Sequence, residues 1–448
     1  MKNEKQLSHK KALVLGIQHL LAMYSGAIAV PLLIGTALNF NSSQMTYLVS
    51  IDIFMCGLAT FLQLARNRYF GIGLPVILGC AIQAVEPLKM IGKEYSIGTM
   101  YGSIIVAGIF VFLIAGQFSK IRKLFPPVVT GSLITVIGLT LIPIAIQNLG
   151  GGDATAKNFG AIPNLLVGGI TILVILGIQF WTRGFLRSIA VLIGLIIGTI
   201  IASFLGMVSL KPITQAAWFH IPQPFYFGIP HFQLSASLTM IIIALVSMVE
   251  STGVFFALGN LLNKEITATD LKKGYRAEGL AVILGGLFNT FPYTTFSQNV
   301  GLLELSGIKT KKPIYWAACL LMLMGLLPKI GALATIIPTP VLGGAMLVMF
   351  SMISIQGIRM LFNVDFTDER NSLIVALSIG SGLGVSVYPQ IFQSLPQALQ
   401  LFLGNGIVIA SICAVGLNLI LKHPQKIDSK ITPTDEKEIA KEFNQIEE

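Results

Sequence analysis

Charge is scarce in this chain of 448 residues, because Asp, Glu, Lys and Arg together make up only 11% of it. An ordinary soluble domain carries roughly 25% of these residues. Apolar residues reach 54% and the mean hydropathy is +0.79, so the composition excludes a soluble enzyme. It also excludes a disordered chain or a coiled coil, whereas the 45 Gly and 20 Pro fit helices that pack closely in lipid.

Cysteine and histidine are also few. The four cysteines lie in apolar stretches without a CxxC pair, so neither a disulfide framework nor a zinc site is expected. They are Cys56, Cys80, Cys319 and Cys413. An intramembrane enzyme would need a metal cluster or a nucleophile–base pair, and the chain has five His but no HExxH or GxSxG motif. We therefore expect no catalytic residue, no metal and no cofactor.

Long uncharged stretches fill most of the chain, and each can hold one or two membrane spans of about 20 residues. They are 12–51, 124–152, 188–210, 212–249, 279–303, 330–358 and 371–421. Breaks at Gly, Pro and polar residues predict fourteen segments, near 12–36, 44–65, 71–86, 97–117, 126–147, 159–181, 188–206, 237–258, 274–291, 292–307, 313–335, 338–358, 371–386 and 400–421. The first segment follows four lysines and lacks a small-residue cleavage site, which indicates a retained span.

The distribution of basic residues supports this count. With the N-terminus inside, fourteen spans place 25 of the 30 Lys and Arg in cytoplasmic segments and five outside, as the positive-inside rule requires. Both termini are therefore expected in the cytoplasm, including a tail over 422–448. The net charge of +10 follows from membrane topology, so nucleic acid is not an expected partner.

Two similar stretches suggest an internal repeat. Residues 125–131 read FPPVVTG and residues 338–344 read PTPVLGG, with an offset of 213 residues that corresponds to seven spans. An odd number of spans turns the second copy upside down in the membrane. Inverted repeats of this kind are typical of secondary transporters.

Two short segments interrupted by Gly or Pro occupy equivalent places in the two halves, 71–83 and 291–301. Each is too short for a crossing helix, so we expect an extended piece followed by a half-helix. Free backbone groups at the midplane are tolerated only where protein or a ligand satisfies them, and such segments form transporter sites. Re-entrant or tilted structural segments remain the alternative.

Ionisable residues inside spans are further candidates, because a charge at the bilayer centre costs at least roughly 2.5–3.5 kcal/mol. They are His19, Asp52, Glu250, Glu278 and Glu304. Glu250 lies deep in an uncharged span, where a carboxyl withdrawn from water exchanges a proton more readily near neutral pH. The alternatives are a neutral acid bonded in the core for Glu250, a structural or interfacial role for Asp52 and Glu304, an interfacial salt bridge for Glu278, and a core histidine for His19.

Two motifs resemble those of the nucleobase-ascorbate transporter family. Gln18 and His19, within GIQHLLAMY, resemble its first-span motif. The stretch 298–307, QNVGLLELSG, resembles its signature QNxGxxxxT followed by Gly, Arg or Lys. Glu250 and the turn at 276–279 match the family's spacings, so the resemblance covers nearly the whole chain.

The resemblance implies an all-α membrane protein with fourteen transmembrane segments in two inverted seven-span repeats, and with short strands in segments 3 and 10 that meet at the site. A core that carries substrate is expected from 12–123 and 237–335. A gate that also forms a homodimer is expected from 124–206 and 336–421. Substrate binding is expected of Glu250, Gln298, Ser297, Asn299 and Cys80, and a proton-coupling and structural network of Glu250, His19 and Glu278.

Several positions depart from the family pattern. Ser306 stands for the signature Thr and Glu278 for an Asp of many members, so the hydroxyl and the carboxylate are kept. Val254 stands where many purine carriers have Asp and some uracil carriers have His. Ile82 replaces a Phe that stacks on the base in several relatives, which leaves stacking on that side open.

The resulting hypothesis is a multi-pass, proton-coupled importer of the cell membrane whose substrate is a purine, xanthine first and uric acid second. Gln298 favours xanthine, because uracil carriers of the family tend to have Glu there. The alternatives are a uracil symporter of the same family and an anion carrier of the same fold. In an anion carrier, half-helix N-termini would hold sulfate or bicarbonate, and Glu250 would repel it.

Overall fold

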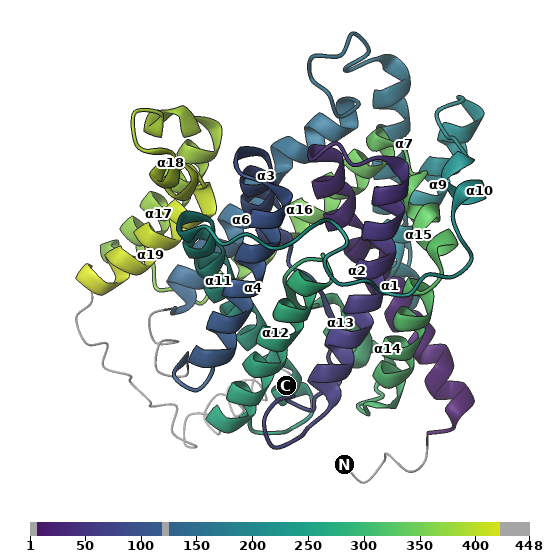
Figure 1. Cartoon of the computed structure of the whole chain (residues 1–448). Coiled ribbons are helices and arrows are strands. Elements are labelled where there is room, and N and C mark those ends of the chain that lie inside the picture. The colour runs from purple at the N-terminus through teal and green to yellow at the C-terminus, as the bar shows by residue number, and fades with distance from the viewer. Residues whose placement is uncertain (1–6, 119–124, 422–448) are drawn as a thin grey trace, which may run out of the picture.

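The computed structural model describes residues 7–118 and 125–421, and it is helical apart from two short strands (Figure 1). Within these ranges, eight helices are long and apolar enough to span a membrane. They are α1 (His9–Ala37), α2 (Ser42–Leu64), α4 (Ile97–Ile114), α6 (Pro127–Gly150), α7 (Ile162–Trp181), α11 (Leu234–Leu261), α16 (Thr339–Leu361) and α17 (Glu369–Val387). The chain is therefore a multi-span helical membrane protein. The predicted tail, 422–448, lies outside the described residues.

The other predicted segments take less regular forms. Two are bent pairs, α14 (Lys312–Gly325) with α15 (Pro328–Thr335) at 83°, and α18 (Gln397–Leu403) with α19 (Gly406–Leu421) at 71°. If each pair is one span, the described part of the chain has up to ten candidate spans. Two more are α9 (Ala190–Phe204), which is short, and α12 (Ala268–Leu287), which begins among charged residues. The last two contain the strands β1 (Leu78–Cys80) and β2 (Tyr293–Thr295).

Short helices complete the described chain. They are η1 (Ile82–Ala84), α3 (Val85–Glu94), α8 (Phe185–Ser188), α10 (Lys211–Gln215), α13 (Gln298–Ser306) and η3 (Pro389–Phe392). Local sequence explains several boundaries. Asn41 and Gln44 form a capping box at the start of α2, and Thr267 with Asp270 does the same for α12. Gly307 ends α13 with a φ of +63°, a conformation that glycine adopts without steric cost.

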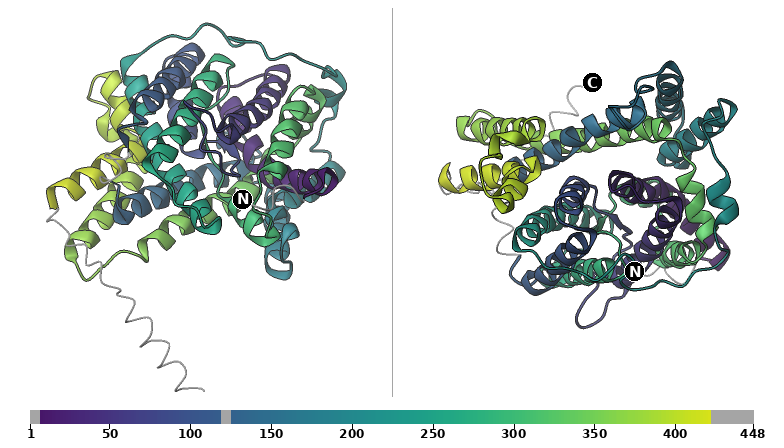
Figure 2. Two further views of the ribbon diagram at one scale, coloured as in Figure 1. Left: turned by 90° about the horizontal axis from the view of Figure 1, so that it is seen from below. Right: turned by 45° about the horizontal axis from the view of Figure 1, so that its top comes forward.

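The two similar sequence stretches begin equivalent helices that pack together. Pro126 is the N-cap of α6 and Pro338 is the N-cap of α16, and proline occupies the first turn of both helices. A Cβ on Gly138 of α6 would collide with Ser354 of α16, so small residues let the two backbones approach closely. The helices α17 and α19 continue this layer (Figure 2).

The helix α7 packs on α16 and belongs to the same layer. The other long helices, α1, α2, α4 and α11, form a cluster beside it, as the right panel of Figure 2 shows with the top of the molecule turned forward. Here α12 packs on α4, and α14 packs on α2 and α1. Glycine again permits the contact, because a Cβ on Gly279 would lie 2.7 Å from the backbone nitrogen of Phe112. The two strands lie within this cluster, where β1 contacts α1 and α2 and β2 contacts α11 and α12.

Candidate functional site

The two interrupted segments meet as an antiparallel pair of strands. Leu78 is opposite Thr295 and Cys80 is opposite Tyr293, and every residue of both strands is buried. The backbone nitrogen of Phe296 extends the ladder by donating to the carbonyl of Ile77 at 2.9 Å. A short helical element follows each strand. The prediction of an extended piece followed by a half-helix is thus confirmed, and each strand satisfies backbone groups of the other.

A small cavity of about 40 Å³ lies beside the strand pair. Four of the predicted binding residues line it: Cys80, Glu250, Ser297 and Gln298. Gln83 of η1 and Thr294 of β2 form another part of its wall. Two helices of the neighbouring layer close the cavity, α6 with Ile134 and Ile137, and α16 with Ile353 and Gln356. A volume of this size holds one or two water molecules, so the cavity would have to widen to hold a molecule with two rings.

Gln83 holds the Glu250 carboxyl in this cavity. Its amide nitrogen donates to Glu250 Oε2 at 3.1 Å and to the Ser247 hydroxyl at 2.8 Å. Ser247 and Glu250 lie three residues apart in α11, so one amide from η1 contacts both on the same helix face. Oε1 of Glu250 has no hydrogen bond from the described residues and remains available to a ligand. Sequence reasoning missed Gln83, although an amide in an otherwise apolar interrupted segment is a usable signal.

Asn299 and His19 contact each other, and neither is among the residues that line the cavity. The Asn299 amide nitrogen donates to the His19 carbonyl at 3.1 Å and lies 3.1 Å from His19 Nδ1. Both side chains are buried, and their contact joins α13 to α1. A direct contact between Asn299 and substrate therefore stays a prediction.

Glu278 is buried in α12 and lines a separate cavity of about 20 Å³ with Ser247 and Tyr293. Its Oε1 has no hydrogen-bond partner among the described residues. An exposed salt bridge at the membrane surface does not describe this position. Ser247, which lines this cavity with Glu278, also accepts a hydrogen bond from the Gln83 amide that contacts Glu250.

Asp52 lies beside the strand pair, a position that the sequence did not predict. It is fully buried in α2, and its carboxyl contacts Cys80 and Tyr293. The ligand atoms of Asp52, Cys56 and Cys80 lie within 4.8 Å of one another, so these are described residues that could hold a metal ion. Hydrogen bonds from the thiols of Cys56 and Cys80 to Asp52 Oδ2 already explain why these atoms lie close together.

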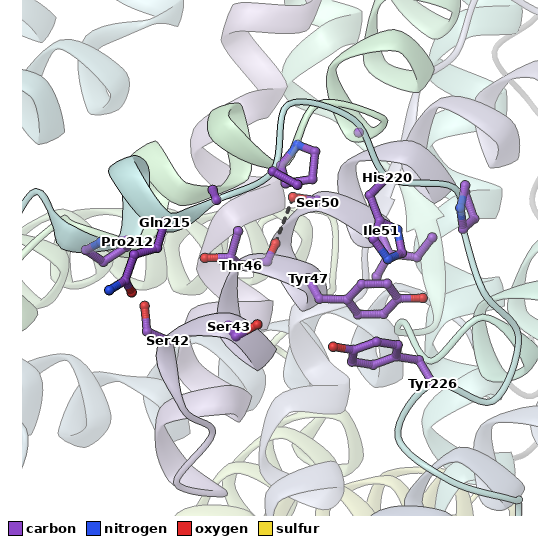
Figure 3. A pocket seen from close by; sticks show the side chains of 15 residues that line it. Ser42, Ser43, Thr46, Tyr47, Ser50, Ile51, Pro212, Gln215, His220 and Tyr226 are labelled. Atoms are coloured by element: carbon purple, nitrogen blue, oxygen red, sulfur yellow. Dashed lines mark hydrogen bonds between the residues drawn. The ribbon is translucent and has the colours of Figure 1, made fainter.

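A larger cavity of about 380 Å³ lies elsewhere, at the start of α2 under the loop that follows α10 (Figure 3). Tyr47 and Tyr226 stack there with ring centroids 3.7 Å apart, and His220 approaches Tyr47 edge-on. Its lining residues include hydroxyls from Ser42 and Ser43 but no carboxylate. The strand pair with Glu250 is therefore the better candidate for a site that binds and releases protons.

Comparison with known proteins identifies the family. Residues 10–391 match the family model of the xanthine and uracil permeases, described as a permease family. A Bacillus subtilis (strain 168) protein named Xanthine permease is 55% identical over 410 residues, which cover 92% of this chain and 93% of that protein. Uric acid permease PucK of the same organism is 52% identical, with 93% and 97% covered.

A solved structure shows the same fold. The transmembrane domain of a cyanobacterium bicarbonate transporter BicA superposes with a TM-score of 0.56 at 16% identity, covering 91% of this chain and 96% of that one. At this identity the likeness concerns the fold alone. The family match and the two close relatives establish more: this chain belongs to the xanthine/uracil permease family, the nucleobase-ascorbate transporters, and is a membrane transporter, not an enzyme.

Proposed function

We propose that this chain is a purine nucleobase permease that imports xanthine, and uric acid as a second substrate, together with protons. The observation that carries the proposal is that Glu250 and Gln298 line one cavity beside the strand pair. The names of its relatives, a xanthine permease and a uric acid permease, agree with a purine as the substrate.

The chemistry of these two side chains fits a purine-dione. A carboxamide offers a donor and an acceptor side by side, so Gln298 pairs with an adjacent N–H and C=O of the ring. Glu250 accepts a hydrogen bond from a second ring N–H through the oxygen that Gln83 leaves unoccupied. Backbone groups near Ser297 and Cys80 complete the pairing. Adenine lacks this pattern of groups and would leave buried polar atoms unpaired.

The architecture supports alternating access. The cluster over 12–123 and 237–335 is the core that carries substrate, and the layer over 124–206 and 336–421 is the gate and dimer face. The small cavity lies at the boundary of the two, since Ile137 of α6 and Ile353 of α16 form one wall. The ten apolar spans, with each bent pair counted as one, make fourteen segments together with α9, α12 and the two strand segments. These fourteen segments form two inverted repeats. Both termini are cytoplasmic in the cell membrane.

Proton coupling is assigned to Glu250, which binds substrate and proton at the same carboxyl. Glu278 and His19 form the structural network behind it. Support comes from burial, because Glu278 and His19 are each enclosed in the cluster that holds the strands. A carboxyl in such surroundings is retained in membrane proteins where it has a role in transport.

Competition for uptake tests the substrate assignment. In cells that lack their own carriers, unlabelled xanthine should displace radiolabelled xanthine far better than uracil, hypoxanthine or adenine does. Gln298→Glu should erode the preference for xanthine over uracil, because a carboxylate cannot donate. Gln390→Glu, at an exposed position in η3, is the matched control and should change nothing. Better displacement by uracil in the unmodified protein would overturn the assignment.

A further inference from the structure

The carboxyl of Asp52 contacts both strands at the same rung of the ladder. Its Oδ1 lies 2.9 Å from the hydroxyl of Tyr293, and its Oδ2 lies 2.7 Å from the sulfur of Cys80. Cys80 and Tyr293 are direct partners in the strand register. One side chain of α2 therefore connects the two strands, in addition to the backbone hydrogen bonds between them.

The same helix holds β1 at a second point. The Thr60 hydroxyl accepts a hydrogen bond from the backbone nitrogen of Leu78 at 3.0 Å. Thr60 lies eight residues after Asp52, about two helical turns, so both side chains project from one face of α2. The Tyr293 hydroxyl also lies 2.8 Å from Thr290, which ties β2 to the end of α12. Side chains of α2 thus fix the strand pair to the surrounding cluster, and the Ser251 hydroxyl of α11 holds β2 at Thr294 and Thr295.

The strand pair needs such support because it is short. Three residues per strand supply few backbone hydrogen bonds, and a two-stranded ladder is marginal without packing. The neighbouring cavity is lined by residues of both strands, Cys80 and Thr294 among them. A change in spacing or tilt between the strands would therefore move the groups that would contact a substrate.

We propose that Asp52 is a positioning residue for substrate binding, a clamp that fixes β1 to β2 by holding Cys80 and Tyr293 at their shared rung. This inference rests on the proposed function for its transport consequences only. The shape and hydrogen-bonding capacity of the side chain are what the clamp requires. Asparagine has the same shape, accepts from Tyr293 through its oxygen and approaches the Cys80 sulfur with its nitrogen.

Two variants separate the clamp from a role in proton movement. Asp52→Val, which lacks both contacts, should raise the KM for xanthine about tenfold or more with a smaller effect on kcat. Asp52→Asn should keep KM within about threefold of the unmodified protein, with the same pH profile. Ser50→Ala is the matched control, because the Ser50 hydroxyl is buried in α2 but donates only to Thr46 of its own helix. Loss of uphill uptake in Asp52→Asn with exchange intact would assign Asp52 to proton coupling and overturn the proposal.

A measurement without substrate keeps the clamp separate from the substrate assignment. Cys80 is buried, whereas Cys319 is exposed and serves as the internal reference for alkylation by N-ethylmaleimide, followed by peptide mass spectrometry of the full chain. Asp52→Val should speed Cys80 alkylation about tenfold relative to Cys319, and Asp52→Asn should not. If Asp52→Val does not reach the membrane, Tyr293→Phe removes one of the two contacts and should produce a smaller increase. Unchanged Cys80 labelling in these variants would refute the clamp, even if xanthine proves not to be the substrate.

Discussion

Replacement of Glu250 tests the coupling mechanism most sharply. Glu250→Gln keeps the side-chain length, and its carbonyl can still accept the 3.1 Å hydrogen bond from Gln83. What the variant loses is the exchangeable proton and the charge. We therefore expect it to reach the membrane and to lose uphill accumulation of xanthine in a pH gradient.

Glu250→Asp tests the geometry of the same group. Loss of one methylene withdraws the carboxyl by about an ångström, so the 3.1 Å contact with Gln83 passes the useful limit of about 3.2 Å. A hydrogen bond to a charged group is worth about 1.5–3 kcal/mol. We therefore expect Glu250→Asp to bind xanthine about tenfold or more weakly than the unmodified protein does. The assay is initial-rate uptake of radiolabelled xanthine with and without a protonophore. Glu369→Gln, at an exposed position in α17, is the control. Uphill uptake by Glu250→Gln equal to that of the unmodified protein would show that Glu250 is not the proton-coupling group.

Three further predictions concern the scaffold. Glu278→Gln should reach the membrane normally yet transport little, because the buried carboxyl lines a cavity with Ser247 next to the Glu250 network; full uptake would exclude this role. Gly279→Ala should lower the thermal unfolding midpoint, at a cost of about 1–3 kcal/mol for overpacking against α4, whereas Gly380→Ala, with no atom within 4 Å, should not. Burial alone would raise the pKa of Asp270, but hydrogen bonds from Thr267 and the charges of Lys264 and Arg66 hold it below its usual value. Its contribution to stability is therefore present above about pH 4 and is lost as pH falls through the lowered pKa. Melting curves across this range should show the loss in the unmodified protein and a flatter response in Asp270→Asn.

The strand pair could be predicted because its signal is local. Segments that are uncharged, interrupted by Gly or Pro and too short to cross the membrane can only be extended or broken there. The register could not be predicted, since it depends on what the neighbouring helices present. That Cys80 is opposite Tyr293, and that Asp52 contacts both, are properties of the packed structure.

Adjacent residues of the signature show a second limit. Gln298 and Asn299 begin the same short helix, and neighbouring positions on a helix face different directions. Gln298 lines the cavity, whereas Asn299 contacts His19 of α1. A motif identifies both residues as a unit, but only the orientation of α13 shows which one faces the cavity. The same holds for Gln83, whose contact with Glu250 joins residues 167 positions apart.

Transport by the purified protein in liposomes shows directly whether xanthine and protons cross the membrane together. With an inward proton gradient and no sodium, we expect radiolabelled xanthine to accumulate above its external concentration and a protonophore to collapse the accumulation. Liposomes that contain Glu250→Gln should show no accumulation under the same gradient. Uptake that is independent of the pH gradient and requires sodium would contradict proton-coupled import of xanthine. Transport of sulfate or bicarbonate in place of xanthine would contradict it as well.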